Sequence, residues 1–501
     1  MQTLENLPQL KLGLIAVSRN NFSETLSEKT LSEVEAFCAE KKLPTVTCSV
    51  LVETEENVME ALEEAKKQGC NALAVLLGNF GQEGPETMLA QYFDGPVMYA
   101  GATEEDQTKL AYDGRRDAYC GMLNCSYNLN LRGVRAYIPE NPIGTSSEIA
   151  EMIAAFLPIA RAAVGLKSLK IIEFGPRPRE FFACNAPING LYQLGVEIEQ
   201  NSELDLLLAY RNHANDPRIP EIVQEMKNEL GDTQYEDSFE KFAQYELTLL
   251  DWAKEHRGAR KYVAFANKCW PAFQLEFGFL PCYVHGRLMA KGIPVSCETD
   301  VYGALSEYIG LCVSGQSVAF LDINNLVPKD LYEAEIEGKY PYRYEDLFIG
   351  FHCGNAPTEI MAEHELKYKK NRREPHLPET GQELTRGTLE GPLKQGEVAC
   401  YRLHAAPDGG LQAYIADGEI LEVAAKTYGC HAIFNVSEMS RFYRHVLIEK
   451  NFPHHSAILY GEFAQHLYDL FRYLGIPYIG YNQPADERYE TENPFRKKKR
   501  K

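Results

Sequence analysis

The first third of the chain alternates short apolar runs with amphipathic stretches of helical periodicity. Such apolar runs predict buried strands, and helices between them let successive strands run parallel in a sheet covered on both faces. The predicted strands are residues 11–17, 45–50 and 72–77, and the predicted helices are residues 27–41, 55–68 and 146–163. This β–α–β order predicts an α/β domain over residues 1–165.

The same alternation returns in the middle of the chain. Further strands are predicted at residues 169–174, 262–266, 294–297 and 318–321. They indicate a second parallel-sheet α/β domain, which we place at residues 166–340.

The sequence pattern changes in the C-terminal part of the chain. Between residues 396 and 434, short alternating strands replace the β–α rhythm, which is typical of a small antiparallel barrel or sandwich. A helix at 461–474 and a strand at 477–480 complete a β-rich domain predicted over residues 341–495. The last six residues, 496–501, are all basic and are expected to form a disordered tail without a function of its own.

The composition excludes several classes of protein. A net charge of −20 argues against a nucleic-acid partner. No apolar run approaches the ~20 residues that span a bilayer, and no basic segment precedes an apolar core at the N-terminus, so neither membrane contact nor secretion is expected. The 13 cysteines include no Cys-x-x-Cys pair and suit free thiols in a reducing cytoplasm. Phosphate-binding glycine motifs for an organic cofactor are also missing.

Two acidic residues that follow predicted strands give the strongest chemical signal. Glu298 and Asp322 each come directly after a short apolar run. Open α/β sheets bind ligands at the carboxyl ends of their strands, so both carboxylates are predicted to face a site. Together with His455 they form a mixed oxygen and nitrogen set suited to a divalent ion such as Mn²⁺. The alternative is structural: a turn cap, a solvated strand end, and a surface pair made by His454 and His455.

Several segments resemble the L-fucose/L-arabinose isomerase superfamily. They are residues 174–178, 268–271, 297–304, 352–355 and 453–456. The resemblance implies an α/β protein with two Rossmann-like, parallel-sheet domains followed by a mostly antiparallel, β-barrel-like domain. It also implies a homo-oligomer, usually a hexamer, with active sites at subunit boundaries.

The resemblance also assigns roles to the acidic and histidine residues. It implies that Glu298 and Asp322 both bind a metal ion and transfer protons, and that His455 is the third ligand. His454 is an alternative ligand. His352 matches a metal ligand of the arabinose branch, or it is a histidine packed at a strand end. The expected metal is Mn²⁺, with Co²⁺ or Mg²⁺ as further candidates.

Four residues are candidates for substrate binding: Arg19, Arg177, Trp270 and Asn355. In the family, the loop that contains Arg19 reaches the active site of a neighbouring subunit. Either arginine suits an anionic group, or is a solvated strand-end residue. Trp270 stacks on a sugar or packs in the core, and Asn355 binds a hydroxyl or forms a turn.

Asp300 lies two residues beyond Glu298 and has two interpretations. It supports the metal site from behind, or it caps the helix that is expected to start near Val301. The capping interpretation is the simpler one.

Two carboxylates and a metal ion suffice to move a hydrogen between adjacent carbons of a sugar. The metal stabilises the developing enediolate while carboxylates exchange the proton. We therefore expect a metal-dependent aldose–ketose isomerase that acts on a sugar of the L-fucose or L-arabinose type. An isomerase of an anionic sugar such as sulfoquinovose is one alternative, and a non-catalytic sugar-binding protein is another.

Overall fold

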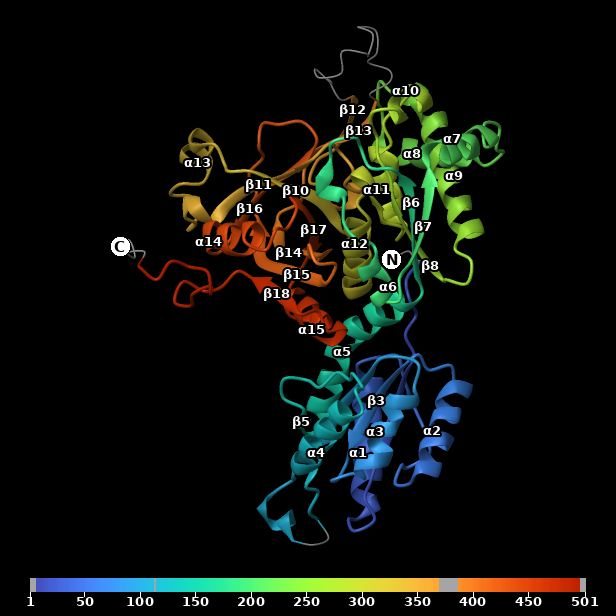
Figure 1. Ribbon diagram of the computed structural model, residues 1–501, viewed down its shortest axis with the longest axis vertical. Coiled ribbons are helices and arrows are strands. Elements are labelled where there is room, and N and C mark those ends of the chain that lie inside the picture. Colours follow the sequence, from blue (N-terminus) through green and yellow to red (C-terminus); the bar gives the residue numbers. More distant parts are fainter. Residues whose placement is uncertain (1–5, 112–113, 369–385, 496–501) are drawn as a thin grey trace. The chain divides into compact units, whose positions relative to one another are not determined.

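The computed structural model describes residues 6–111, 114–368 and 386–495, and the predicted basic tail lies outside them. The described chain forms two compact units (Figure 1). One comprises residues 8–165 with 472–475, and the other comprises the remaining described residues. The break after Gly165 coincides with the first predicted boundary, whereas the further boundary near residue 340 stays a prediction.

The N-terminal unit is built on a five-stranded parallel sheet with strand order β2-β1-β3-β4-β5. Its strands are β1 (Leu12–Val17), β2 (Thr45–Thr47), β3 (Ala72–Leu77), β4 (Val97–Ala102) and β5 (Ile143–Gly144). Its helices are α1 (Glu24–Glu40), α2 (Glu55–Lys67), α3 (Glu83–Tyr92), α4 (Ala118–Leu131) and α5 (Ser146–Lys167). Strands β1, β3 and β4 are buried along their whole length because helices cover the sheet. This confirms the predicted strands β1 and β3, whereas β4 was not predicted.

Helix α5 is long and apolar enough to span a bilayer by length and composition alone, with a mean hydropathy of 1.7. Its sequence is not an unbroken apolar run, because Glu148, Glu151 and Arg161 interrupt it. Over half of its apolar window, 56%, is buried inside the protein. Ile149, Ile153 and Phe156 are fully buried, as in a core helix.

The larger unit starts with a four-stranded parallel sheet of order β7-β6-β8-β9. Its strands are β6 (Leu169–Gly175), β7 (Glu197–Ser202), β8 (Tyr262–Ala266) and β9 (Val295–Ser296). The helices of this part are α6 (Asn189–Gln193), α7 (Glu203–Asn212), α8 (Ile219–Leu230), α9 (Phe239–His256), α10 (Phe273–Phe277), α11 (Cys282–Ala290) and α12 (Val301–Ser314). The sheet confirms the second predicted parallel arrangement.

The rest of this unit is a nine-stranded sheet whose central six strands close into a barrel. They are β10 (Ala319–Asn325), β11 (Leu347–His352), β14 (Gly396–Ala405), β15 (Leu411–Ile420), β16 (Cys430–Val436) and β17 (His455–Tyr460). All six contacts around the ring are antiparallel, and the β15–β16 pair closes it. Further strands are β12 (Glu365–Tyr368), β13 (Arg386–Pro392) and β18 (Tyr478–Tyr481), and the helices are α13 (Lys329–Glu335), α14 (Met439–Phe442) and α15 (Ala464–Leu474). The predicted β-barrel-like domain is thus confirmed.

One strand is not where the sequence pattern places it. The apolar run before Asp322 was expected to continue the second parallel sheet, but it forms β10 of the antiparallel barrel. Asp322 therefore lies inside a strand and not at its carboxyl end. The prediction was wrong because a buried barrel strand and a buried parallel strand have the same apolar pattern.

Helix α12 joins the parallel sheet to the barrel (Figure 1). It packs against β8 and β9 on one side and against β14 and β17 on the other. Every residue from Val301 to Val313 is buried, which explains why the helix is apolar on all sides. Gly303 allows the close approach, since a Cβ there would lie 2.3 Å from the Ser296 hydroxyl and 2.6 Å from the Phe320 ring. This packing brings the start of α12 to the barrel wall.

Candidate metal centre

The chain turns sharply at the predicted glutamate. Strand β9 ends at Ser296, and Glu298 and Thr299 both adopt left-handed backbone conformations with φ of 58° and 61°. Such conformations are strained for residues with a side chain, and they concentrate at functional sites. The backbone amide of Thr299 donates to the carbonyl of Asn267 and so holds the turn. The Glu298 carboxylate is thereby fixed between the parallel sheet and the barrel.

Strand pairing places the other two predicted residues beside each other. Asp322 on β10 and His455 at the start of β17 are directly opposite partners in an antiparallel ladder. Side chains of such pairs project to the same face of the sheet. This register explains how residues far apart in the sequence reach one site.

The imidazole of His455 is the centre of the cluster. It is fully buried, and its Nε2 lies 2.9 Å from Glu298 Oε2 and 3.5 Å from Asp322 Oδ1. The structure therefore brings each predicted carboxylate to His455. Among the described residues, no single group of mutually close ligand atoms contains both Glu298 and Asp322. The carboxylates of Glu298 and Asp322 keep 17% and 20% of their side-chain surface exposed, so solvent and small ligands reach them.

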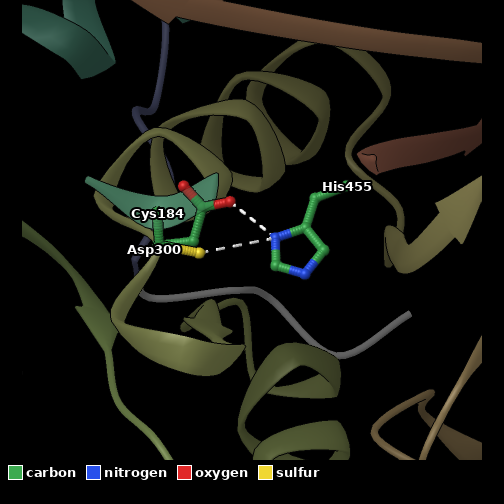
Figure 2. Close-up of side chains that lie close together, drawn as sticks. All are labelled: Cys184, Asp300 and His455. Atoms are coloured by element: carbon green, nitrogen blue, oxygen red, sulfur yellow. Dashed lines mark hydrogen bonds and ion pairs between the residues drawn. The ribbon is translucent and has the colours of Figure 1, made fainter. Parts of the chain in front are cut away.

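The other ring nitrogen of His455 faces the interior (Figure 2). Its Nδ1 lies 2.8 Å from Asp300 Oδ2 and 3.9 Å from the thiol sulfur of Cys184. Asp300 also caps α12 by accepting a hydrogen bond from the amide of Gly303 at 2.8 Å. The capping interpretation of Asp300 is thus confirmed, and the same carboxylate holds His455 from behind.

Arg402 completes the support behind His455. This arginine of β14 is fully buried, and its Nη2 donates to both oxygens of Asp300 at 2.8 Å. Burial by itself would raise the pKa of Asp300, but the charge of Arg402 and the hydrogen bond from His455 hold it far below its usual value. Asp300 therefore carries a fixed negative charge and accepts a hydrogen bond from the protonated Nδ1 of His455.

The protonation of the centre follows from these contacts. Burial alone would lower the pKa of His455, but its hydrogen bonds to Asp300, Cys184 and Glu298 raise it well above its usual value. Burial would likewise raise the pKa of Glu298, yet the hydrogen bond and charge of His455 lower it to about 2. Both shifts show that the cluster attracts positive charge.

The donor set fits a divalent cation. The cluster holds three carboxylates and one guanidinium, Arg402, which pairs with Asp300, so the two negative charges of Glu298 and Asp322 remain uncompensated when His455 is neutral. A bound metal ion would displace the Nε2 proton of His455, and with the other proton held on Nδ1 by Asp300 the Nε2 lone pair would face the two carboxylates. A histidine fixed by a carboxylate behind it is the usual arrangement of metal-binding histidines. Glu298, Asp322 and His455 thus offer the ligands and the charge that Mn²⁺ requires.

His454 and His352 border the same centre. His454 Nε2 lies 3.7 Å from Asp322 Oδ1, and burial together with the charge of His455 lowers the pKa of His454 to about 4. His352 forms a close group with Glu298 and His455. The amide of Cys353 donates to His352 Nδ1 at 2.9 Å, so the proton of a neutral His352 ring belongs on Nε2. This contact disfavours His352 as a ligand through Nε2.

Apolar side chains enclose the histidines. The Phe320 ring centre lies 4.8 Å from that of His455, and Phe181 contacts both His454 and His455 at 5.4 Å and 5.9 Å. These rings lower the local dielectric and strengthen the ion pairs beside them. The sequence analysis did not identify Phe181, Phe320, Cys184 or Arg402.

Among the described residues, four groups of His, Cys, Asp and Glu side chains lie close enough to share an ion, and three of them contain His455. The fourth consists of His213, Asp216 and Asp251, at the C-terminal end of α7 and on α9. Its carboxylates are paired with Arg218 at 2.6 Å and 2.5 Å. An arginine already occupies that group, so the cluster around His455 is the metal-centre candidate.

The predicted substrate-binding residues have different surroundings. Arg177 donates to the backbone carbonyls of Pro178 and Arg179 and lies over the Phe182 ring. Trp270 is half-buried beside an apolar group of cysteines. Asn355 is buried and accepts from the thiol of Cys430.

Arg19 belongs to the N-terminal unit. Its guanidinium lies over the Phe80 ring at 4.6 Å and 3.9 Å from Glu83. Its role toward a neighbouring subunit stays a prediction.

A cavity of about 390 Å³ adjoins the metal centre from the side of the parallel sheet. Arg177 and Arg179 line it together with Glu173. Cys184, which contacts His455, and Thr299, which follows Glu298, form part of its wall. The cavity therefore places two arginines near the proposed ligands.

Comparison with known proteins matches an N-terminal and a C-terminal segment of the chain to family models. A family model described as "Fucose/sulfoquinovose isomerase, N-terminal domain" matches residues 13–167, and one described as "L-fucose isomerase, C-terminal domain" matches residues 350–482. The sulfoquinovose isomerase of Priestia aryabhattai is 24% identical over 354 residues, which cover 68% of this chain and 70% of the relative. That of Alkalicoccus urumqiensis is 21% identical over 335 residues, covering 66% and 69%.

Proposed function

Because the chain belongs to the L-fucose/L-arabinose isomerase superfamily and is an aldose–ketose isomerase, we propose that it isomerises a sulfonated sugar with a divalent metal ion. The observation that carries the metal dependence is the convergence of Glu298, Asp322 and His455, with Asp300 behind the histidine. The non-catalytic sugar-binding alternative loses its support, because the relatives are named as isomerases.

Glu298, Asp322 and His455 would hold the ion, with Mn²⁺ as the preferred metal and Co²⁺ or Mg²⁺ as substitutes. When bound, a divalent ion supplies Lewis-acid polarisation of the sugar's carbonyl oxygen, which acidifies the neighbouring C–H bond. A carboxylate of Glu298 or Asp322 beside the reacting carbons then accepts the proton and returns it to the adjacent carbon. Asp300 and Arg402 keep His455 in one orientation throughout.

The proposed substrate class is anionic. The relatives are named sulfoquinovose isomerases, which favours a sulfonated sugar over one of the L-fucose type. Arg177 and Arg179 in the adjoining cavity supply the positive charge that a sulfonate requires, and guanidinium groups match the geometry of such oxyanions. Trp270 and Asn355 remain proposed contacts for the neutral part of the sugar.

Two further properties of the isomerase are proposals. A homo-oligomer such as a hexamer would let the loop that carries Arg19 reach the site of a neighbouring subunit. A cytoplasmic location would keep the thiols of the 13 cysteines reduced.

Product formation from matched sugars tests the substrate class. The protein with Mn²⁺ is incubated with sulfoquinovose and with quinovose, which lacks only the sulfonate, and the ketose is measured by NMR. We expect kcat/KM to be at least about tenfold higher for the sulfonated sugar, the effect of one charged hydrogen bond of ~1.5 kcal/mol. Equal values for both sugars would exclude the sulfonate-specific proposal, and turnover of L-fucose alone would restore the neutral-sugar one.

A further inference from the structure

Helix α4 of the N-terminal unit exposes a continuous apolar stripe. Tyr119, Leu123, Tyr127 and Leu131 follow one another at intervals of four residues, which places them along one face of the helix. Their exposed fractions are 74%, 63%, 63% and 63%. Large apolar side chains at this spacing are usually turned toward a core, so an exposed row of them marks a contact surface.

Contacts on the opposite face of α4 hold the helix in an orientation that exposes the stripe. Met122, Cys125 and Leu129 are buried against the parallel sheet. On the flank, Asn124 and Asn128 each donate to the carboxylate of Glu83 on α3. The helix therefore cannot turn its stripe into its own core without breaking these contacts.

The charge of α4 indicates which partner fits the stripe. Its 14 residues include no Asp, Glu, Lys or Arg, whereas an average segment of a chain with 24% charged residues would hold about three. Two copies of a chain with a net charge of −20 repel each other over most of their surface. An uncharged face is where two such copies approach with the least repulsion.

We propose that the stripe on α4 is an interface between two copies of this chain. In this two-fold contact α4 lies antiparallel to α4 of the partner, with the axis passing between Leu123 and Tyr127. Each leucine of the stripe then meets a tyrosine of the other copy. Rows at intervals of four residues are the ridges that interdigitate in the commonest class of helix packing.

The area of the stripe agrees with this assignment. A buried tyrosine contributes about 150–250 Å² and a leucine somewhat less, so the four side chains of each copy supply roughly 500 Å². Two copies then bury about 1,000 Å², the lower end of the range for a specific interface, before any flanking residues are counted. The proposal does not depend on the substrate or the metal.

The mass in solution tests the proposal directly. We expect light scattering to give the wild-type protein a mass at least twice that of the 56.6 kDa chain. The double substitution Leu123→Glu and Tyr127→Glu puts two like charges at the two-fold axis and should lower the mass by at least a factor of two. A matched control, Leu204→Glu with Leu208→Glu, changes two exposed leucines of α7 and should leave the mass unchanged.

Three results of this experiment would overturn the proposal. They are a wild-type monomer, an α4 double variant that keeps the wild-type mass, and a control that dissociates equally. If the wild-type protein were a monomer, the stripe would instead contact a different partner or another part of the same chain.

A second measurement uses the wild-type protein alone, so it holds even where the double variant fails to fold. Cys120 is exposed beside Tyr119 on α4, and the contact would shield it. We expect a bulky maleimide to label Cys120 at least about tenfold more slowly than the same thiol in a short peptide. Labelling as fast as in the peptide, read by mass spectrometry, would contradict the interface.

Discussion

His455 and Asp300 share a buried contact of 2.8 Å between Nδ1 and Oδ2. Arg402 fixes the same carboxylate from the opposite side, so the imidazole has one orientation and one position for its Nδ1 proton. The consequence is that Nε2 points at Glu298 and Asp322. This contact fixes the orientation of the histidine in the proposed donor set.

Replacing Asp300 by Asn should weaken metal binding. The neutral amide no longer fixes the Nδ1 proton, so we expect the affinity for Mn²⁺ to fall 10- to 100-fold by calorimetric titration, the effect of losing such a supporting group. The variant should also unfold more easily by about 3 kcal/mol, because Arg402 loses its buried partner. The control Ser202→Ala removes a comparable cap from α7, away from the centre, and should leave Mn²⁺ binding intact. Unchanged affinity in the Asp300 variant would refute the orienting role.

Replacing Glu298 by Gln should remove turnover without unfolding the protein. The amide keeps the shape of the side chain and tolerates the same backbone conformation, but it cannot accept a proton from carbon. We expect kcat to fall at least about 100-fold, the usual contribution of a positioned general base. Circular dichroism should stay near wild type, whereas the melting temperature should fall moderately because the Glu298 charge is stabilised by His455. The exposed Glu180 provides the matched control, and Glu180→Gln should keep full activity.

Turnover in D₂O should place deuterium on the carbon that receives the proton. Glu298 and Asp322 are partly exposed, so a proton held by either carboxylate can exchange with solvent before it is returned. We expect partial to complete label at C1 of the ketose or C2 of the aldose, read by NMR. A direct hydride shift carries the original hydrogen between the carbons, and full retention of that hydrogen after many turnovers would establish it.

Glu86 should make the stability of the N-terminal unit depend on pH. Burial raises the pKa of this α3 carboxyl to about 8, above the value of about 4.5 expected in the unfolded chain. The folded state then binds more protons than the unfolded state between these values, so stability present below pH 4.5 is lost as pH rises toward 8. Replacing Glu86 by Gln should flatten this dependence, with a gain of a few kcal/mol near pH 8 at most. Parallel melting curves of both proteins from pH 5 to 8 would contradict this account.

The parallel sheets could be predicted from the sequence because their signal is local. The apolar runs at β1, β3 and β6 and the amphipathic stretches between them have the lengths found in the structure. Glu298 could be placed for the same reason, since it lies in the turn that follows β9.

Asp322 shows where local patterns fail. Its strand has the apolar sequence of a parallel core strand, and only its long-range pairing with β17 assigns it to the barrel. The resemblance nevertheless named Asp322 together with His455, and the structure places the two residues opposite each other. The role of Asp322 as a metal ligand stays a prediction, and its position inside a strand was not predicted.

Arg402 could not be assigned a partner from the sequence, since Asp300 lies 102 residues away. A signal was nevertheless present. A single arginine between Tyr401 and Leu403, inside the apolar strand β14, indicates a buried charge that must be paired. His404 on the same strand differs, because burial and the charge of Arg402 lower its pKa to about 3 and keep its ring neutral.

Metal removal tests the central claim most directly. The protein is dialysed against a chelator until no metal is detected, and isomerase activity is measured before and after addition of Mn²⁺. The donor set of Glu298, Asp322 and His455 predicts that turnover is lost in the metal-free protein and restored by Mn²⁺, with Co²⁺ or Mg²⁺ less effective. Full activity of the metal-free protein would contradict the account.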